Sequence, residues 1–135
     1  MGNNDHPTPT PEDRMPSPLL RDATMASLRE EGEDFLLDLI DLFVTEAPKR
    51  LAALAAALGK SDHALVQLAA HTLESTAAIF GADALQAVAA AAELAARAGD
   101  LREVARLLTP LRAAAEQVQL VLLAERQMLL ASHVA

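Results

Sequence analysis

The fold is decided by residues 61–99, which read SDHALVQLAAHTLESTAAIFGADALQAVAAAAELAARAG. Two alanine- and leucine-rich runs of helical length are separated by Gly81, and Gly99 ends the second run. Ser61 is taken as the N-cap of the first helix and Asp83 as the N-cap of the second. Because the connection at Gly81 is short, the two helices should be antiparallel neighbours. The segment therefore predicts a helical hairpin.

One histidine of this hairpin falls outside the apolar face of its helix. At about 100° per residue, His71 points away from the expected core stripe. That stripe consists of Leu65, Ala69, Thr72, Leu73, Thr76, Ile79 and Phe80. The outward neighbours of His71 are Ala64, Gln67, Glu74, Ser75 and Ala78. Most of these neighbours are short, so the imidazole should be reachable by a docking protein, and we interpret it as a nucleophile.

Helical patterns cover most of the remaining chain. A short helix is expected over residues 20–30, and a stronger one from residue 34 to Gly59, continuing through Pro48. A last helix opens at Asp100, which forms a capping-box pattern with Glu103. The expected core positions of the two long helices are Phe35, Leu39, Phe43, Ala47, Leu51, Leu54 and Leu58, followed by Val104, Leu108, Leu111, Ala115, Val118 and Leu122.

These patterns predict one all-α domain. The first 18 residues contain five prolines among polar residues, and we interpret them as a flexible tail. Residues 19–135 have the length of a single domain. Four long helices joined by short loops favour an antiparallel up-down bundle, here with a short extra N-terminal helix.

Composition excludes several classes of function. The net charge of −8 and the aromatic content of 2% argue against nucleic-acid binding, which needs a basic surface and stacking platforms. The chain has no cysteine, so disulfides and thiolate metal sites are excluded, and we expect a cytoplasmic protein. No secretory signal or membrane-spanning run is expected. Neither a phosphate-binding glycine loop nor the residue set of a hydrolase or kinase is present.

The residues around His71 resemble a known signature. His71 is followed by Thr72, Leu73, Glu74, Ser75, Thr76 and Ala77, and then by Gly81 and Ala82. This order resembles histidine-containing phosphotransfer (HPt) domains, in which His-x-Leu-Lys-Gly-Ser/Thr-Ala precedes a short apolar stretch and Gly-Ala. The resemblance covers about residues 21–123. It implies a helical bundle whose exposed histidine accepts a phosphoryl group in a two-component phosphorelay.

Two residues of the following helix should lie beside the histidine. His71 is ten residues before Gly81 and Glu93 is twelve after it, so the two reach similar heights on adjacent helices. Arg97 lies one turn beyond Glu93 on the same face. Without His71, this pair would be interpreted as a solvated surface ion pair. The resemblance implies that Glu93 orients the imidazole and that Arg97 contacts the phosphoryl group.

Two motif positions depart from the family pattern. Glu74 stands where the family usually has lysine, and Ser75 where it usually has glycine. A carboxylate about 6 Å from a phosphoryl group costs about 0.7 kcal/mol in a water-like dielectric and about 3 kcal/mol at an effective constant of 20. Glu74 should therefore weaken the phosphohistidine, and Ser75 suggests a narrowed range of receivers.

The leading hypothesis is a phosphotransfer intermediate without kinase or phosphatase activity. It would exchange a phosphoryl group between His71 and the aspartate of response-regulator receiver domains, and receive it from a receiver or a hybrid histidine kinase. The resemblance places Mg²⁺ on the receiver, and no cofactor or metal site is expected in this chain. His6, His63 and His133 are interpreted as surface residues.

Two alternatives remain open. One is a binding module that docks receivers or kinases without phosphotransfer, with Glu74 as its sequence mark. The other is a dimerising bundle that uses a second apolar stripe of the last helix, formed by Leu120, Leu123 and Leu130. The same stripe could equally pack under the N-terminal helix. We expect a monomer, with a dimer through the last helix as the alternative.

Overall fold

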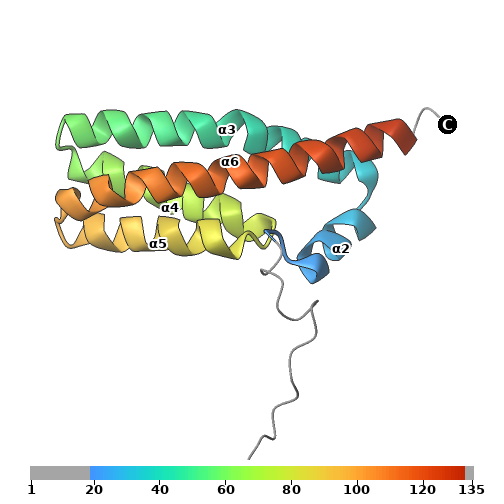
Figure 1. The fold of residues 1–135 in the computed structure, drawn as a ribbon, viewed down its shortest axis with the longest axis horizontal. Coiled ribbons are helices and arrows are strands. Elements are labelled where there is room, and N and C mark those ends of the chain that lie inside the picture. Colours follow the sequence, from blue (N-terminus) through green and yellow to red (C-terminus); the bar gives the residue numbers. More distant parts are fainter. Residues whose placement is uncertain (1–18, 133–135) are drawn as a thin grey trace, which may run out of the picture.

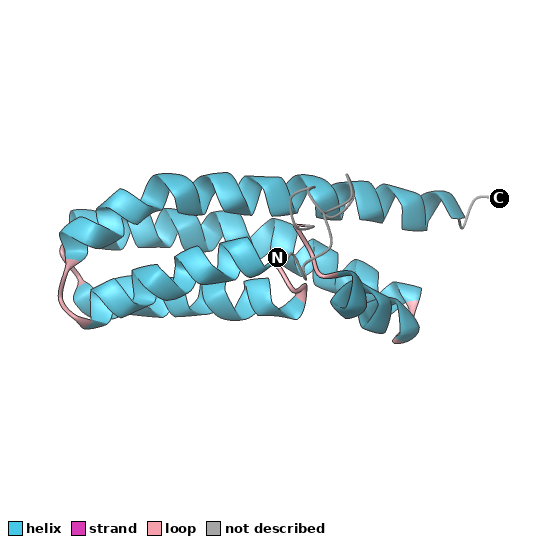
Figure 2. Ribbon diagram, turned by 60° about the horizontal axis from the view of Figure 1, so that its bottom comes forward, coloured by secondary structure: helices cyan, strands magenta, loops and turns pink. Residues whose placement is uncertain are grey.

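The computed structural model describes residues 19–132, and all of its regular structure is helical (Figures 1 and 2). The helices are α2 (Asp22–Glu30), α3 (Glu33–Gly59), α4 (His63–Ile79), α5 (Asp83–Arg97) and α6 (Leu101–Ser132). The predicted tail over residues 1–18 lies outside the described range. The predicted α3 does continue through Pro48, and α6 continues through Pro110.

The four long helices form an antiparallel bundle. Each packs on its neighbours in the chain, and α6 closes the bundle by packing on α3. Helix α2 lies at one end, beside the turn that joins α4 to α5 (Figure 1). The predicted four-helix bundle with a short N-terminal helix is confirmed. None of the helices within residues 19–132 combines the length and the apolar character that crossing a membrane requires.

Two of the predicted helix caps are wrong. The N-cap of α4 is Asp62, whose carboxylate accepts a hydrogen bond from the Leu65 amide at 3.2 Å, whereas Ser61 adopts a left-handed conformation with φ of 54°. Asp83 is the first residue of α5 and does not cap it. Its carboxylate instead pairs with Arg21 at 2.8 Å.

The capping box predicted for the last helix is confirmed in part. Asp100 Oδ1 accepts a hydrogen bond from the Glu103 amide at 3.1 Å. The Glu103 carboxylate pairs with Arg106 at 2.8 Å. The Asp100 amide donates to the carbonyl oxygen of Ala95. Asp100 therefore caps the helix, and the Glu103 side chain does not bond back to the Asp100 amide as a complete capping box requires.

The core of the hairpin differs from the predicted stripe. Leu65 is 51% exposed, Ile79 is 38% exposed, and Phe35 of α3 is 45% exposed. The buried positions of α4 are Val66, Ala69, Ala70, Leu73 and Ala77, followed by Phe80 at the helix end. The buried positions of α3 include Leu36 and Ile40. Thr72 and Thr76 of α4, which were expected in the core stripe, are half-buried. Small alanine side chains let adjacent helices approach closely, so alanines occupy the interface and several leucines stay outside it.

The turn between α4 and α5 is fixed by residues from the N-terminal segment. The amide of Arg21 donates to the carbonyl oxygen of Gly81 at 3.1 Å, and the Arg21 guanidinium pairs with Asp83. Gly81 has a φ of 64°, and a Cβ atom there would lie 2.8 Å from Arg21 Cβ and 2.8 Å from Thr24 Oγ1. A glycine is thus required for both the backbone angle and the close approach. Phe80 packs edge-on against Phe43 of α3 at 5.9 Å between ring centroids.

Gly81→Ala should lower the free energy of unfolding by about 1–3 kcal/mol, because it adds a left-handed alanine and an overpacked methyl group. Gly59→Ala is the matched control, since its Cβ would have nothing within 4 Å, and it should leave stability unchanged or slightly raised. Urea denaturation followed by circular dichroism measures both. Equal effects of the two substitutions would contradict this account of the turn.

The C-terminal part of α6 is tied to the helices that precede the hairpin. Arg29 of α2 makes two 3.0 Å hydrogen bonds to Glu125, and Arg126 pairs with Asp41 of α3 at 2.8 Å. In the predicted second stripe, Leu123 is half-buried, whereas Leu120 is 68% and Leu130 is 40% exposed. The dimer that this stripe suggested stays a prediction.

Candidate functional site

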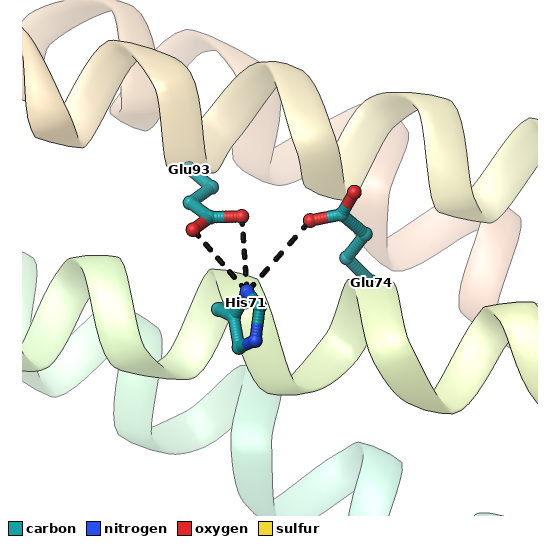
Figure 3. Close-up of side chains that lie close together, drawn as sticks. All are labelled: His71, Glu74 and Glu93. Carbon is teal, nitrogen blue, oxygen red and sulfur yellow. Dashed lines mark hydrogen bonds and ion pairs between the residues drawn. The ribbon is translucent and has the colours of Figure 1, made fainter.

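His71 lies in the middle of α4 with its ring at the surface. Its side chain is 58% exposed, although the adjacent Ala70 and the nearby Leu73 are buried in the core. In Figure 3, Nδ1 faces two carboxylates and the other ring nitrogen points away from both. The predicted exposure of the histidine is therefore correct, and Nε2 has no hydrogen-bond partner among residues 19–132.

Glu93 of α5 holds the inner nitrogen of the ring. Its carboxylate oxygens both lie 3.2 Å from His71 Nδ1, and the residue is only 8% exposed. Arg97 Nη2 donates to Glu93 Oε2 at 2.8 Å, one turn further along α5. An ionised carboxylate accepts hydrogen bonds, so this contact selects the tautomer with the proton on Nδ1. The pairing of His71, Glu93 and Arg97 expected from their helix heights is present.

Glu74 turns toward the same pair and away from the free nitrogen (Figure 3). Its Oε1 atom lies 4.0 Å from His71 Nδ1. A hydrogen bond with Glu93, reinforced by partial loss of solvent and by the charge of Glu93, raises the pKa of Glu74. The same hydrogen bond, together with those from His71 and the charge of Arg97, lowers the pKa of Glu93. As pH falls, Glu74 is therefore protonated before Glu93.

Replacing Glu74 by glutamine should stabilise the fold at neutral pH. A carboxyl group whose pKa is raised by folding stabilises the native state when protonated, and that contribution is lost as pH rises above the ordinary value of 4.5. Glu74→Gln removes the like charge beside Glu93 and supplies an amide group that can donate a hydrogen bond to it. We expect a gain of less than about 1 kcal/mol at pH 7 that disappears toward pH 4. Thermal unfolding at both pH values tests this, and a gain independent of pH would contradict it.

The residues predicted for docking lie around His71 on one face of α4. Ala64, Ser75 and Ala78 are exposed, and Gln67 is half-buried. Ala64 and Gln67 line a shallow hollow with Leu68, His71 and Glu93. A second hollow on the other side of the ring is lined by His71, Glu74, Ala90, Glu93, Leu94 and Arg97.

The prediction missed the two leucines of these hollows. Leu68 is 58% exposed and Leu94 is 65% exposed. They give the surface beside the histidine an apolar component. Their outward positions follow from the helical pattern, but single apolar residues are common on protein surfaces, so the sequence alone did not distinguish these two.

A cation could be held only on the carboxylate side of the ring, within the described residues. His71 Nδ1 and one oxygen each of Glu74 and Glu93 lie within 4.8 Å of one another. The guanidinium of Arg97 already occupies Glu93 Oε2, and its fixed positive charge opposes a dication at this position. Of the other histidines, His63 is exposed at the start of α4, and His6 and His133 lie outside the described residues.

Comparisons with known proteins agree with this geometry. The model of the Hpt domain family matches residues 38–121. Among solved structures, the chain is similar to histidine-containing phosphotransfer protein B (HptB) from Pseudomonas aeruginosa PAO1. The two share 31% sequence identity with a TM-score of 0.79, over 84% of this chain and 98% of the other. No curated protein matches the chain. With a matching family model over the bundle and an exposed, braced histidine at its surface, the chain belongs to the Hpt domain family.

Proposed function

We propose that this protein accepts a phosphoryl group on Nε2 of His71 and exchanges it with the aspartate of receiver domains. The observation that carries the proposal is the asymmetry of the ring: Nδ1 contacts the buried Glu93, and Nε2 points away from both carboxylates on an exposed side chain. A nucleophile needs one nitrogen with a free lone pair, and a neutral imidazole protonated on Nδ1 supplies it.

The transfer step requires no base from this chain. The Nε2 lone pair attacks the phosphorus atom, the bond from phosphorus to the aspartate oxygen breaks, and the aspartate leaves as a carboxylate. Nδ1 keeps its proton throughout, so the ring gains one positive charge, which the Glu93 carboxylate stabilises. We assign the Mg²⁺ that neutralises the phosphoryl oxygens to the receiver domain, and no cofactor to this chain.

Arg97 is the proposed contact to the phosphoryl group. Its side chain is 60% exposed and lies one turn beyond Glu93. Since guanidinium groups bind phosphoryl oxygens well, Arg97 can serve Glu93 with one nitrogen and the incoming group with another. The docking surface then consists of Ala64, Gln67, Glu74, Ser75 and Ala78.

Incubation with phosphorylated receiver domains of the same organism tests the proposal. The protein should acquire a label that is stable in base and labile in acid, which is the signature of phosphohistidine. No label from any receiver would contradict the proposed function.

A second candidate is a binding module that docks receivers without phosphotransfer, favoured by the negative charge of Glu74 beside the ring. Transfer in Glu74→Lys but not in the wild type would support the binding module. Transfer by the wild type itself would exclude it. Hybrid histidine kinases are the proposed upstream partners in either case.

A further inference from the structure

Two carboxylates from different helices converge on one nitrogen of His71. Glu93 reaches it from α5 at 3.2 Å, and Glu74 reaches it from α4 at 4.0 Å (Figure 3). The proposed transfer requires only one acceptor for the Nδ1 proton, and Glu93 fills that role. The structure therefore leaves the second carboxylate without a function in that mechanism.

The arrangement is electrostatically costly in the resting protein. One carboxylate oxygen of Glu74 and one of Glu93 lie within 4.8 Å of each other. This interaction with Glu93, together with lost solvent, raises the pKa of Glu74. The charged and titratable groups that face this point, among the described residues, are His71 and Glu74 from α4 and Glu93 and Arg97 from α5. Arg97 is paired with Glu93 Oε2. A new positive charge on the imidazole would therefore be favourable to Glu74 as well as to Glu93.

Phosphorylation supplies that charge. When a bond forms between Nε2 and phosphorus while Nδ1 keeps its proton, the ring becomes a cation. In the reverse transfer the bond between nitrogen and phosphorus breaks, its electron pair returns to Nε2, and the leaving group is a neutral imidazole. Loss of the Nδ1 proton would instead make the leaving group an anion, which departs much less readily. Retention of this proton therefore controls how well the phosphohistidine donates its group.

Resting on the proposed function, we propose that Glu74 is a second counter-ion of the phosphorylated ring, which keeps the Nδ1 proton in place and the phosphohistidine competent as a donor at higher pH. Glu74 is a positioning residue in this role, because it acts through the ring proton and not on the phosphoryl group. Its carboxylate lies on the Nδ1 side, nearer to the new positive charge than to the group on Nε2 (Figure 3).

The test follows the phosphorylated ring directly. Phosphoramidate phosphorylates exposed histidines chemically, and the ³¹P chemical shift of the product reports whether the ring proton is present. Glu74→Gln should move the midpoint of this titration down by about 0.7 of a pH unit, the effect of removing one unit charge at 4 Å in a water-like dielectric. Glu116→Gln is the matched control, since this exposed residue of α6 lies outside the site, and it should leave the midpoint unchanged.

The outcomes separate this inference from the proposed function. The resonance that disappears in His71→Gln belongs to His71. If that resonance is present and its midpoint is the same in the wild type and in Glu74→Gln, only the counter-ion role is overturned. If phosphoramidate and phosphorylated receivers both leave His71 unmodified, the proposed function and the inference fall together. Receivers are not needed for the titration, so lack of a matching receiver cannot obscure the result.

Discussion

Replacing His71 by glutamine should abolish the phosphoryl label that the protein acquires from a phosphorylated receiver. Glutamine has a similar reach, but its amide nitrogen has no free lone pair with which to attack phosphorus. Because the His71 side chain is 58% exposed, its loss should change the free energy of unfolding by no more than about 0.5 kcal/mol. The loss of label can then be attributed to chemistry and not to unfolding. The measurement is the amount of label that each protein acquires from a phosphorylated receiver, followed by its loss on treatment with acid.

His63→Gln is the control matched to this variant. His63 is an exposed histidine at the start of the same helix, without a carboxylate contact among the described residues. The His63→Gln protein should acquire as much label as the wild type. If His71→Gln keeps its label, the accepting residue lies elsewhere, and His63 would be tested next.

The bundle could be predicted from the sequence because its signals are local. Gly81 and Gly99 adopt positive φ at the ends of their helices, where glycine is a strong stop signal. Short connections then leave few ways to pack the helices. The exact buried face could not be predicted. Leu65 looks like a better core residue than Ala70, yet Ala70 is fully buried because it permits close approach of the neighbouring helix. That preference depends on the partner helix and cannot be read from one helix alone.

The site was predictable where the hairpin determined it. Counting residues from Gly81 brings Glu93 and His71 to the same height, and the contact at 3.2 Å is present. The direction of Glu74 was not predictable. A side chain three residues from His71 can turn toward either ring nitrogen, and its direction depends on the neighbouring helix α5, whose Glu93 carboxylate lies within 4.8 Å of the Glu74 carboxylate. From the sequence, Glu74 was expected only to repel the phosphoryl group and so to weaken the phosphohistidine. Its position beside Nδ1 adds an attraction to the ring proton.

Replacing Glu93 by alanine should lower the rate of phosphotransfer about 10- to 100-fold, the usual effect of removing a group that orients a functional histidine. Two contributions are lost together. The Nδ1 proton is no longer held by a buried acceptor, so the ring can rotate and change tautomer. The positive charge that develops on the ring also loses its nearest counter-ion, which lies 3.2 Å away. Glu93→Gln retains an acceptor oxygen but no charge, and it should fall between alanine and the wild type.

Glu103→Ala is the appropriate control, since Glu103 is also a helix carboxylate paired with an arginine at 2.8 Å, but on α6 and outside the site. Transfer kinetics with one phosphorylated receiver, measured for all three variants under single-turnover conditions, separate orientation from charge. If Glu93→Gln matches the wild type, hydrogen bonding alone explains the role of Glu93. If it matches Glu93→Ala, charge dominates, and Glu74 should then support residual transfer because it is the remaining carboxylate at Nδ1. Wild-type rates in both variants would contradict the assigned role, because neither the ring's tautomer nor its charge would then depend on Glu93.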